Sequence, residues 1–282
     1  MRKKFLKSKM IGVITVILAL FMAVGVAEEE ITDASGLWKY VLEDDGTVIV
    51  GCMEPRGEVT LPSKLSGYPV TGIGDRAFES CDELTGIVIS KYVTTIGEEA
   101  FHGCTRLTGV TFSKSVERIG RRAFRGCVSL ESITLPGGLK VIEEGAFNGC
   151  GLTDVRIPSA VESIGINPFI GCPMKSIGVA SANPYYEKID GVLFDKRERE
   201  LVAYPTLRWG ACAIPEGTLR IGSRAFYYCE NLSEITIPDS VTDIGDQAIT
   251  GCEKLVGLIV TKDSYAEQYA KENNISYVLA AE

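Results

Sequence analysis

Apolar residues recur along the chain at a fixed spacing, in a unit represented by residues 93–112, VTTIGEEAFHGCTRLTGVTF. The unit reads Ile-Gly-x-x-Ala-Phe-x-x-Cys-x-x-Leu-x-x-Ile/Val-x-Ile/Leu. Cysteines mark its register, with intervals of 22 or 23 residues within the two runs Cys81, Cys104, Cys127, Cys150, Cys172 and then Cys229, Cys252. Phenylalanines keep the same step, with Ile249 in the last place, at Phe78, Phe101, Phe124, Phe147, Phe169 and Phe226. So short a period with apolar residues in phase predicts a solenoid of stacked repeats.

Each unit divides into three short pieces. The apolar alternation after the leucine predicts a strand with one face inward, at Ile87/Ile89, Val110/Phe112, Ile133/Leu135, Val155/Ile157 and Ile235/Ile237. The Ile-Gly pair predicts an extended return that ends in a glycine turn. Ala-Phe-x-x-Cys predicts a helical or 3-10 turn too short to persist unless its phenylalanine is buried.

The ends of the chain and one interruption depart from the repeat. Residues 1–27 combine basic residues, an apolar run and small residues before an acidic stretch, which predicts a secretory signal peptide cleaved after Ala27. An uncleaved anchor is the alternative, because the apolar run of about 17 residues reaches the lower limit of spanning length. Residues 28–58 are predicted to cap the solenoid with a hairpin over 37–50 that turns at Asp45-Gly46.

The solenoid itself is predicted over residues 59–260, with an inserted hairpin at about 182–206. The strands of this hairpin are expected at 191–194 and 201–204, on either side of the charged turn 196–200. Residues 261–282 are predicted to form a C-terminal cap with a helix over 264–271 and a last strand.

Charge excludes one class of partner. The formal net charge is −8, and loss of the five basic residues of the signal segment makes it −13. Binding to nucleic acid needs a basic face, so we expect no nucleic-acid partner and, after cleavage, no insertion into a membrane.

Nine cysteines in an exported protein would ordinarily indicate disulfides. Equivalent residues of stacked repeats lie about 5 Å apart with parallel side chains, whereas a disulfide needs Cβ atoms about 3.8 Å apart. The seven in-register cysteines are therefore predicted to form a buried column of free thiols. Cys52 and Cys212 lie outside this register.

The units ESITLPGGLKVIEEGAFNGC and SEITIPDSVTDIGDQAITGC resemble the BspA-like leucine-rich repeats. The insert YEKIDGVLFDKRERELVAYP and the ending SYAEQYAKENNISY also look like this family. The resemblance implies a curved leucine-rich-repeat solenoid with a parallel sheet on its concave side, and a secreted or cell-surface protein linked to adhesion. Three positions depart from the pattern: Pro168 and Ile249 replace the alanine and the phenylalanine, and Glu143 replaces the glycine.

The sequence offers no catalytic, cofactor-binding or metal-binding motif. His102 is the single histidine, and the equivalent positions of other units hold residues of every type, so a surface position is predicted. No second histidine completes a triad or a zinc site with it. We therefore expect no enzyme.

Two sets of residues are candidates for binding. Outward strand positions are small and mostly uncharged, which suits close approach of a protein partner, although such residues would equally suit a tightly curved sheet; the candidates are Thr111, Thr134, Arg156 and Thr236. Aromatic residues gather at the interruption, where they would anchor a glycan or simply pack the inserted hairpin; the candidates are Tyr185, Tyr186, Trp209 and Tyr228. A column of alternating charges at 75–76, 98–99, 121–122 and 144 predicts ion pairs between neighbouring repeats.

These observations leave three functional hypotheses. The first is a secreted or surface protein that binds an extracellular protein, on a host or a neighbouring cell, through its solenoid face. The second is a carbohydrate-binding module that uses the aromatic residues. The third is a structural spacer of the cell envelope.

Overall fold

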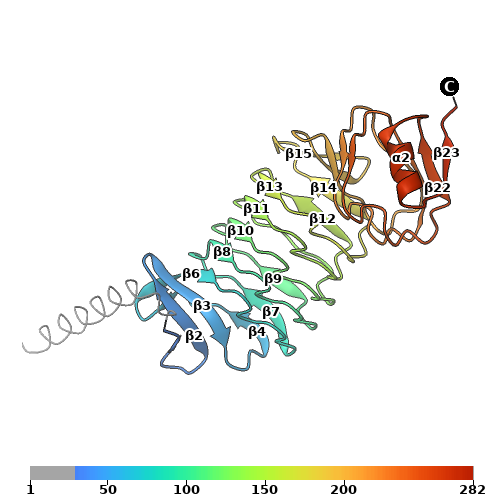
Figure 1. Ribbon diagram of the computed structural model, residues 1–282. Helices are drawn as coiled ribbons and strands as arrows, with labels where there is room; N and C mark the ends of the chain where they lie inside the picture. The colour runs from blue at the N-terminus through green and yellow to red at the C-terminus, as the bar shows by residue number, and fades with distance from the viewer. Residues whose placement is uncertain (1–28, 282) are drawn as a thin grey trace, which may run out of the picture.

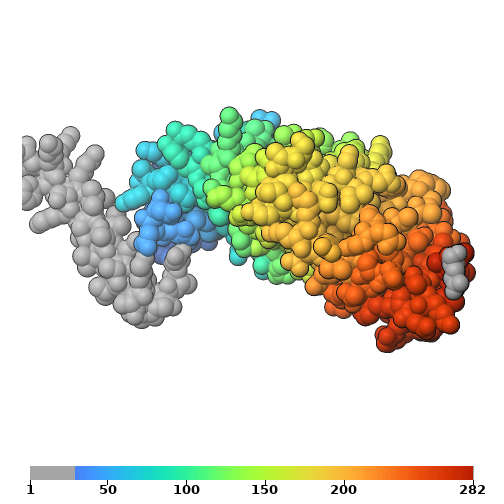
Figure 2. Space-filling model, turned by 90° about the horizontal axis from the view of Figure 1, so that it is seen from above, coloured from blue at the N-terminus to red at the C-terminus, as the bar shows by residue number. Residues whose placement is uncertain are grey.

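The chain winds into a solenoid whose coils follow one another in chain order. The computed structural model describes residues 29–281, so the predicted signal peptide lies outside the described residues. Figures 1 and 2 show an elongated body in which successive segments form successive bands. Each coil therefore packs mainly against two neighbours, as expected for a solenoid. In the described residues, no helix combines the length and the apolar character needed to cross a membrane.

Two parallel ladders of strands run along the coils. The first ladder follows the leucine of the repeat and consists of three sheets: β4 (Gly57–Thr60), β7 (Leu84–Val88) and β9 (Gly109–Thr111); β12 (Asp154–Ile157) and β14 (Ser176–Val179); and β18 (Gly210–Ala213), β20 (Leu232–Ile237), β22 (Gly257–Val260) and β23 (Tyr277–Leu279). In the second ladder most strands end at the isoleucine of the Ile-Gly pair. It has two runs: β6 (Tyr68–Ile73), β8 (Thr95–Ile96), β10 (Arg118–Ile119), β11 (Val141–Ile142) and β13 (Ser163–Ile164); then β17 (Glu200–Ala203), β19 (Arg220–Ile221) and β21 (Asp243–Ile244). The predicted extended return is thus itself a parallel sheet.

One predicted strand is absent from the first ladder. Residues 131–136 have no strand assignment, although alternation predicts a strand at Ile133/Leu135. Leu135 is nevertheless buried and Thr134 exposed. The alternation of apolar and polar residues therefore predicts which side chains face the core. Leu135 is buried even though its segment forms no strand.

A hairpin closes the N-terminal end. β2 (Trp38–Glu43) pairs antiparallel with β3 (Gly46–Cys52) and with β1 (Ile31–Thr32). The turn falls at residues 44–45, and the prediction of Asp45-Gly46 is wrong by one residue because Gly46 already belongs to β3. A Cβ at Gly46 would lie 2.6 Å from Pro69 O, so this glycine permits the close approach of β6. β5 (Lys64–Leu65) pairs antiparallel with β6.

A helix and a strand close the C-terminal end, where α2 (Tyr265–Glu272) precedes β23 (Figure 1). The Ser264 hydroxyl accepts the N–H of Glu267 at 3.2 Å, which is the N-cap arrangement expected of serine. Ala266 and Ala270 are buried. The predicted C-terminal helix is confirmed, and it covers the last coil.

The core is a stack of phenylalanine rings. Successive ring centroids are 5.0 to 5.8 Å apart and the rings are nearly parallel, along the series Phe78, Phe101, Phe124, Phe147 and Phe169. Trp38 of the hairpin meets Phe78 edge-on, with 6.5 Å between centroids. The N-terminal hairpin thus continues the aromatic core that the first coil would otherwise expose.

The cysteines form the predicted column, and all nine are free. Five of the thiols donate to the carbonyl of the phenylalanine in the preceding coil, as in Cys127 to Phe101 O at 3.2 Å and Cys150 to Phe124 O at 3.0 Å. The end members of the register, Cys81 and Cys252, are only half-buried. Burial raises the pKa of Cys52 to about 11, with a smaller contribution from Cys81. Cys52 therefore lies beside the thiol column, although it falls outside the repeat spacing in the sequence.

We expect thiol reactivity to follow this burial. In the folded protein at neutral pH, a soluble alkylating reagent should modify Cys52, Cys81 and Cys252 slowly, because partial burial raises the pKa of these thiols, and should spare the buried ones. In denaturant, mass spectrometry should count nine modified cysteines. One or none modified in denaturant would show that the thiols are paired as disulfides.

Candidate functional site: a notch at the inserted hairpin

The insert is a three-stranded antiparallel unit whose last strand belongs to the solenoid. β15 (Tyr186–Ile189) pairs with β16 (Val192–Asp195), and β16 pairs with β17. β17 then pairs in parallel with β19. The predicted hairpin is therefore present, but it also carries the chain back into the second ladder.

The coil that contains β17 is two residues shorter than its neighbour. Leu201 is the ladder partner of Ile221, and Tyr204 N donates to Ala225 O as Phe226 N donates to Ala248 O. Tyr204 therefore takes the place of the repeat phenylalanine, and its ring lies 5.0 Å from that of Phe226. Phe226 comes five positions after Ile221, whereas Tyr204 comes only three positions after Leu201. The glycine turn of this coil is missing.

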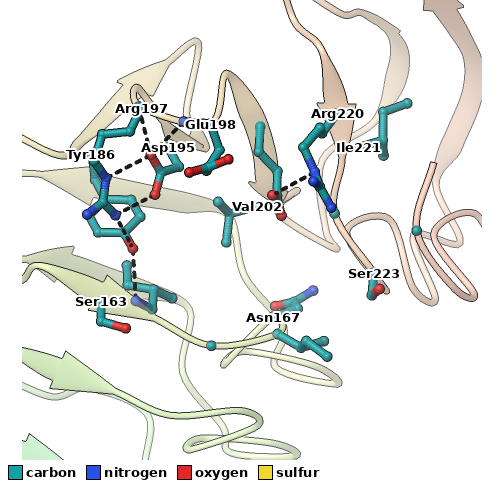
Figure 3. Close-up of a pocket in the computed structure, with 16 residues that line it drawn as sticks. Ser163, Asn167, Tyr186, Asp195, Arg197, Glu198, Val202, Arg220, Ile221 and Ser223 are labelled. Carbon is teal, nitrogen blue, oxygen red and sulfur yellow. Dashed lines mark hydrogen bonds and ion pairs between the residues drawn. The ribbon is translucent and has the colours of Figure 1, made fainter. Parts of the chain in front are cut away.

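A pocket of about 340 Å³ occupies the place of the missing turn. One wall is formed by 163–167 with Tyr186, the floor includes Val202, and the other wall is formed by 220–223. Its rim carries the charged residues Asp195, Arg197, Glu198 and Glu200 (Figure 3). We call this pocket the notch.

Asn167 bridges the notch. Its side chain is buried, its Nδ2 donates to Arg224 O at 2.8 Å, and its Oδ1 accepts the N–H of Phe169 at 3.2 Å. Residues at this repeat position have positive φ in other coils, such as Arg122 at 54° and Arg224 at 57°. Asn167 does not, because it precedes Pro168, and proline disfavours helical conformations in the residue before it.

A second bridge is ionic. Arg224 Nη1 lies 3.1 Å from Glu144 Oε1, a residue 80 positions earlier in the chain. Together with Asn167, this contact links the coils on the two sides of the shortened one.

Tyr186 completes the edge of β13. It is buried, its hydroxyl accepts the N–H of Ile164 at 2.8 Å, and Arg197 Nη2 donates to it at 3.3 Å (Figure 3). Burial raises the pKa of Tyr186 to about 12. Tyr186 is therefore a packing residue. Of the two roles that the sequence leaves open, its burial fits packing of the inserted hairpin and not a surface anchor.

Two arginines of the notch form three ion pairs. Asp195 accepts from Arg197 Nη2 at 2.7 Å and from the N–H of Arg197 at 2.8 Å. Burial raises the pKa of Asp195, but these hydrogen bonds outweigh it and hold that pKa below its ordinary value. Arg220 lies 3.5 Å from Glu200 Oε2 and 2.9 Å from Asp243 Oδ2.

The other aromatic candidates do not form one platform. Tyr185 is half-buried with the Arg197 guanidinium 4.6 Å from its ring centroid. Trp209 is 70% exposed and has Lys254 Nζ 4.4 Å from its ring centroid. Tyr228 is exposed beside Tyr227. Trp209 and Tyr228 therefore remain as separate exposed rings.

The outward positions of the first ladder, which we call the strand face, hold the other four candidates. Thr111 lies in β9, Arg156 in β12 and Thr236 in β20, while Thr134 belongs to no strand. Thr111, Thr134 and Arg156 are exposed, and Thr236 is half-buried. The structure thus presents three of the four fully to solvent.

Repeat spacing also brings charges together across coils. Arg76 Nε lies 2.9 Å from Glu99 Oε2, and further pairs are Arg121–Glu98, Arg118–Glu143 and Lys140–Glu117. The predicted ion pairs between repeats are confirmed. The Glu143 carboxylate also accepts the N–H of Arg121 at 2.7 Å, which gives the residue that replaces the repeat glycine a structural role.

His102 lies partly exposed at the surface and contacts a charged residue of the neighbouring coil. Its Nδ1 lies 3.2 Å from Glu79 Oε1, and donor atoms of Glu79, Glu99 and His102 lie within 4.8 Å of one another. These three could ligate a metal ion, but Arg76 and Arg122 already pair with Glu99 and oppose a cation there. Sequence reasoning missed the group because its members come from neighbouring coils.

Comparisons with known proteins agree on one family. Residues 70–196 and 206–276 match the BspA type leucine rich repeat region, in six copies. The gap between these ranges contains β17 and Tyr204 of the shortened coil. No curated protein matches the chain.

Several solved structures are similar. A leucine rich cell surface protein from Faecalibacterium prausnitzii A2-165 is 28% identical, with a TM-score of 0.59 over 83% of this chain and 77% of that one. The T. pallidum leucine rich repeat protein TpLRR is 25% identical, with a TM-score of 0.55 over 89% of this chain and 99% of that one. The pneumococcal vaccine antigen PcpA, 20% identical with a TM-score of 0.66 over 83% of this chain and 71% of that one, shares the fold.

Proposed function

The chain belongs to the BspA-type leucine-rich-repeat family, and from this membership we propose that it acts at the cell surface by binding an extracellular protein through the strand face. The similar structure at 28% identity is a leucine rich cell surface protein, which supports this location. The predicted secretory signal supports export. The proposal includes no catalysis and no cofactor.

The composition of the strand face is the observation that carries the proposal. In the coils before the insert, its outward residues are mostly small and uncharged, at Val88, Gly109, Thr111, Ser132, Thr134, Ser176 and Gly178. Arg156 and Asp154 add charge at one point of β12. Such a face lets a partner approach a rigid backbone closely, and an exposed arginine is a side chain favoured at interaction hot spots.

A binding screen tests the proposal. Purified residues 28–282 would be screened against extracellular-matrix proteins and a glycan array. For a protein that binds saturably, Arg156→Glu or Thr134→Arg should weaken binding about tenfold or more, equal to roughly 1.4 kcal/mol. Arg125→Glu and Thr250→Arg are matched controls, because both residues are exposed at the turn after the repeat phenylalanine and should leave the affinity unchanged.

Other outcomes would contradict the proposal. Exposed Trp209 favours a second candidate function, carbohydrate binding, since aromatic rings stack on sugars. Glycan binding lost in Trp209→Ala but kept in Arg156→Glu would establish that function instead. Absence of binding to both libraries would favour the structural spacer.

A further inference from the structure

The wall of the notch includes a backbone carbonyl, Ile164 O, whose equivalents in the preceding coils accept backbone N–H groups. In the preceding coil, Lys140 O accepts the N–H groups of Glu162 and Ser163 at 2.9 and 3.1 Å, and Ile142 O accepts that of Gly165 at 2.8 Å. The equivalent acceptors of the next coil are Glu162 O and Ile164 O, and within residues 29–281 no backbone N–H bonds to either. The reason is that β13 ends its sheet, while β17 pairs with β16 and β19.

Tyr186 satisfies only half of this edge. Its hydroxyl accepts the N–H of Ile164 and so replaces a carbonyl of the missing strand. Within residues 29–281, no side chain donates to these carbonyls. Unpaired backbone carbonyls are strong hydrogen-bond acceptors. A ligand that donates hydrogen bonds would therefore satisfy this wall of the notch.

The charged rim of the notch also favours a ligand that is positively charged. Figure 3 shows the Glu198 side chain between Asp195 and Arg220. In the described part of the chain, the Glu198 carboxylate has no hydrogen bond or ion pair. Both arginines of the rim are already engaged, Arg197 by Asp195 and Arg220 by Glu200 and Asp243. The charge left without a partner is therefore negative.

Glu200 adds to this bias. Burial, with help from nearby Asp195, Glu198 and Asp243, raises the pKa of Glu200 against the opposing effect of Arg220. A carboxylate in such surroundings is one whose charged form a bound cation would stabilise.

We propose that the notch binds a guanidinium or primary ammonium group, whose N–H groups donate to Ile164 O and whose charge meets Glu198 and Glu200. Such a cation supplies several donors for the wall that contains Ile164 O and a positive charge for the rim that contains Glu198. The volume of about 340 Å³ is at the small end of ligand pockets and suits one basic side chain or a small organic cation. This inference stands independently of the strand face.

Calorimetric titration of residues 28–282 tests the inference with three probes. These are agmatine, an acetylated and amidated Gly-Arg-Gly peptide, and the same peptide with citrulline, which keeps the shape of arginine without its charge. We expect the arginine peptide or agmatine to bind and the citrulline peptide to fail. Glu198→Gln should weaken binding about tenfold, as expected for loss of a hydrogen bond to a charged group.

The control variant is Glu187→Gln, an exposed residue of β15 that does not line the notch, and it should leave the affinity unchanged. Binding of the peptide alone would identify a partner's basic side chain as the source of the cation. Binding of agmatine, with or without the peptide, would show that the free cation suffices. No binding by either cation, or equal affinity in Glu198→Gln, would overturn the inference whatever the outcome at the strand face.

Discussion

Replacement of Phe124 by alanine should lower the free energy of unfolding by about 3 to 5 kcal/mol, the range for a fully buried phenylalanine. Phe124 has no exposed surface. Its ring stacks on Phe101 at 5.0 Å and on Phe147 at 5.5 Å, and Phe112 meets it edge-on at 6.2 Å. Alanine removes three aromatic contacts at once, and the coils on both sides are held by their own hydrogen bonds and cannot collapse into the cavity. Urea unfolding of residues 28–282 measures the change.

A neighbouring position in the same coil supplies the control. Val128 is 58% exposed, so Val128→Ala should change the stability by less than about 0.5 kcal/mol. Phe124→Leu keeps most of the apolar volume and should fall between the two. A loss below about 1.5 kcal/mol in Phe124→Ala would mean that the stack relaxes around the deletion and is not the rigid column that the ring spacings indicate.

The sequence predicted the features that repeat from coil to coil. When residues 23 apart become neighbours, one spacing determines the phenylalanine stack, the thiol column and the pairing of Arg76 with Glu99. The same logic explains why the C-terminal helix was predictable, since Ser264 is a local cap. Features that repeat at each coil, and features that depend only on residues close in sequence, can be predicted from the sequence alone.

The notch could not be predicted from the repeat spacing, because it arises where one coil is two residues shorter than its neighbour. Tyr204 stands 22 residues before Phe226, and this spacing was the available signal. With Leu207 in the cysteine position, however, the unit no longer matches the repeat. The two missing residues become visible only when the ladder pairs Leu201 with Ile221. The burial of Tyr186 follows from that deletion, because its hydroxyl bonds to the N–H of Ile164 at the edge of β13.

The same deletion makes Asn167 the side chain on which the two halves of the solenoid depend. The buried residues form two core clusters, one ending around the insert and the other beginning there. Asn167→Ala removes the partner of Arg224 O and that of Phe169 N. Because each buried backbone group left unpaired costs about 1 to 3 kcal/mol, we expect the stability to fall by roughly 2 to 4 kcal/mol. Hydrogen exchange should also show earlier opening of residues 206–279 than of residues 70–170.

Gln247→Ala is the matched control, because Gln247 occupies the same repeat position as Asn167 and is exposed. Its side chain accepts from the Arg224 guanidinium at 3.0 Å but bridges no missing turn, so its loss should cost at most about 1 kcal/mol. If Asn167→Ala lowers stability no more than Gln247→Ala, the halves are joined by the Glu144–Arg224 pair and the inserted strands alone. If it lowers stability without changing the order of opening, the two clusters fold as one cooperative unit and the notch is a surface feature of a continuous core.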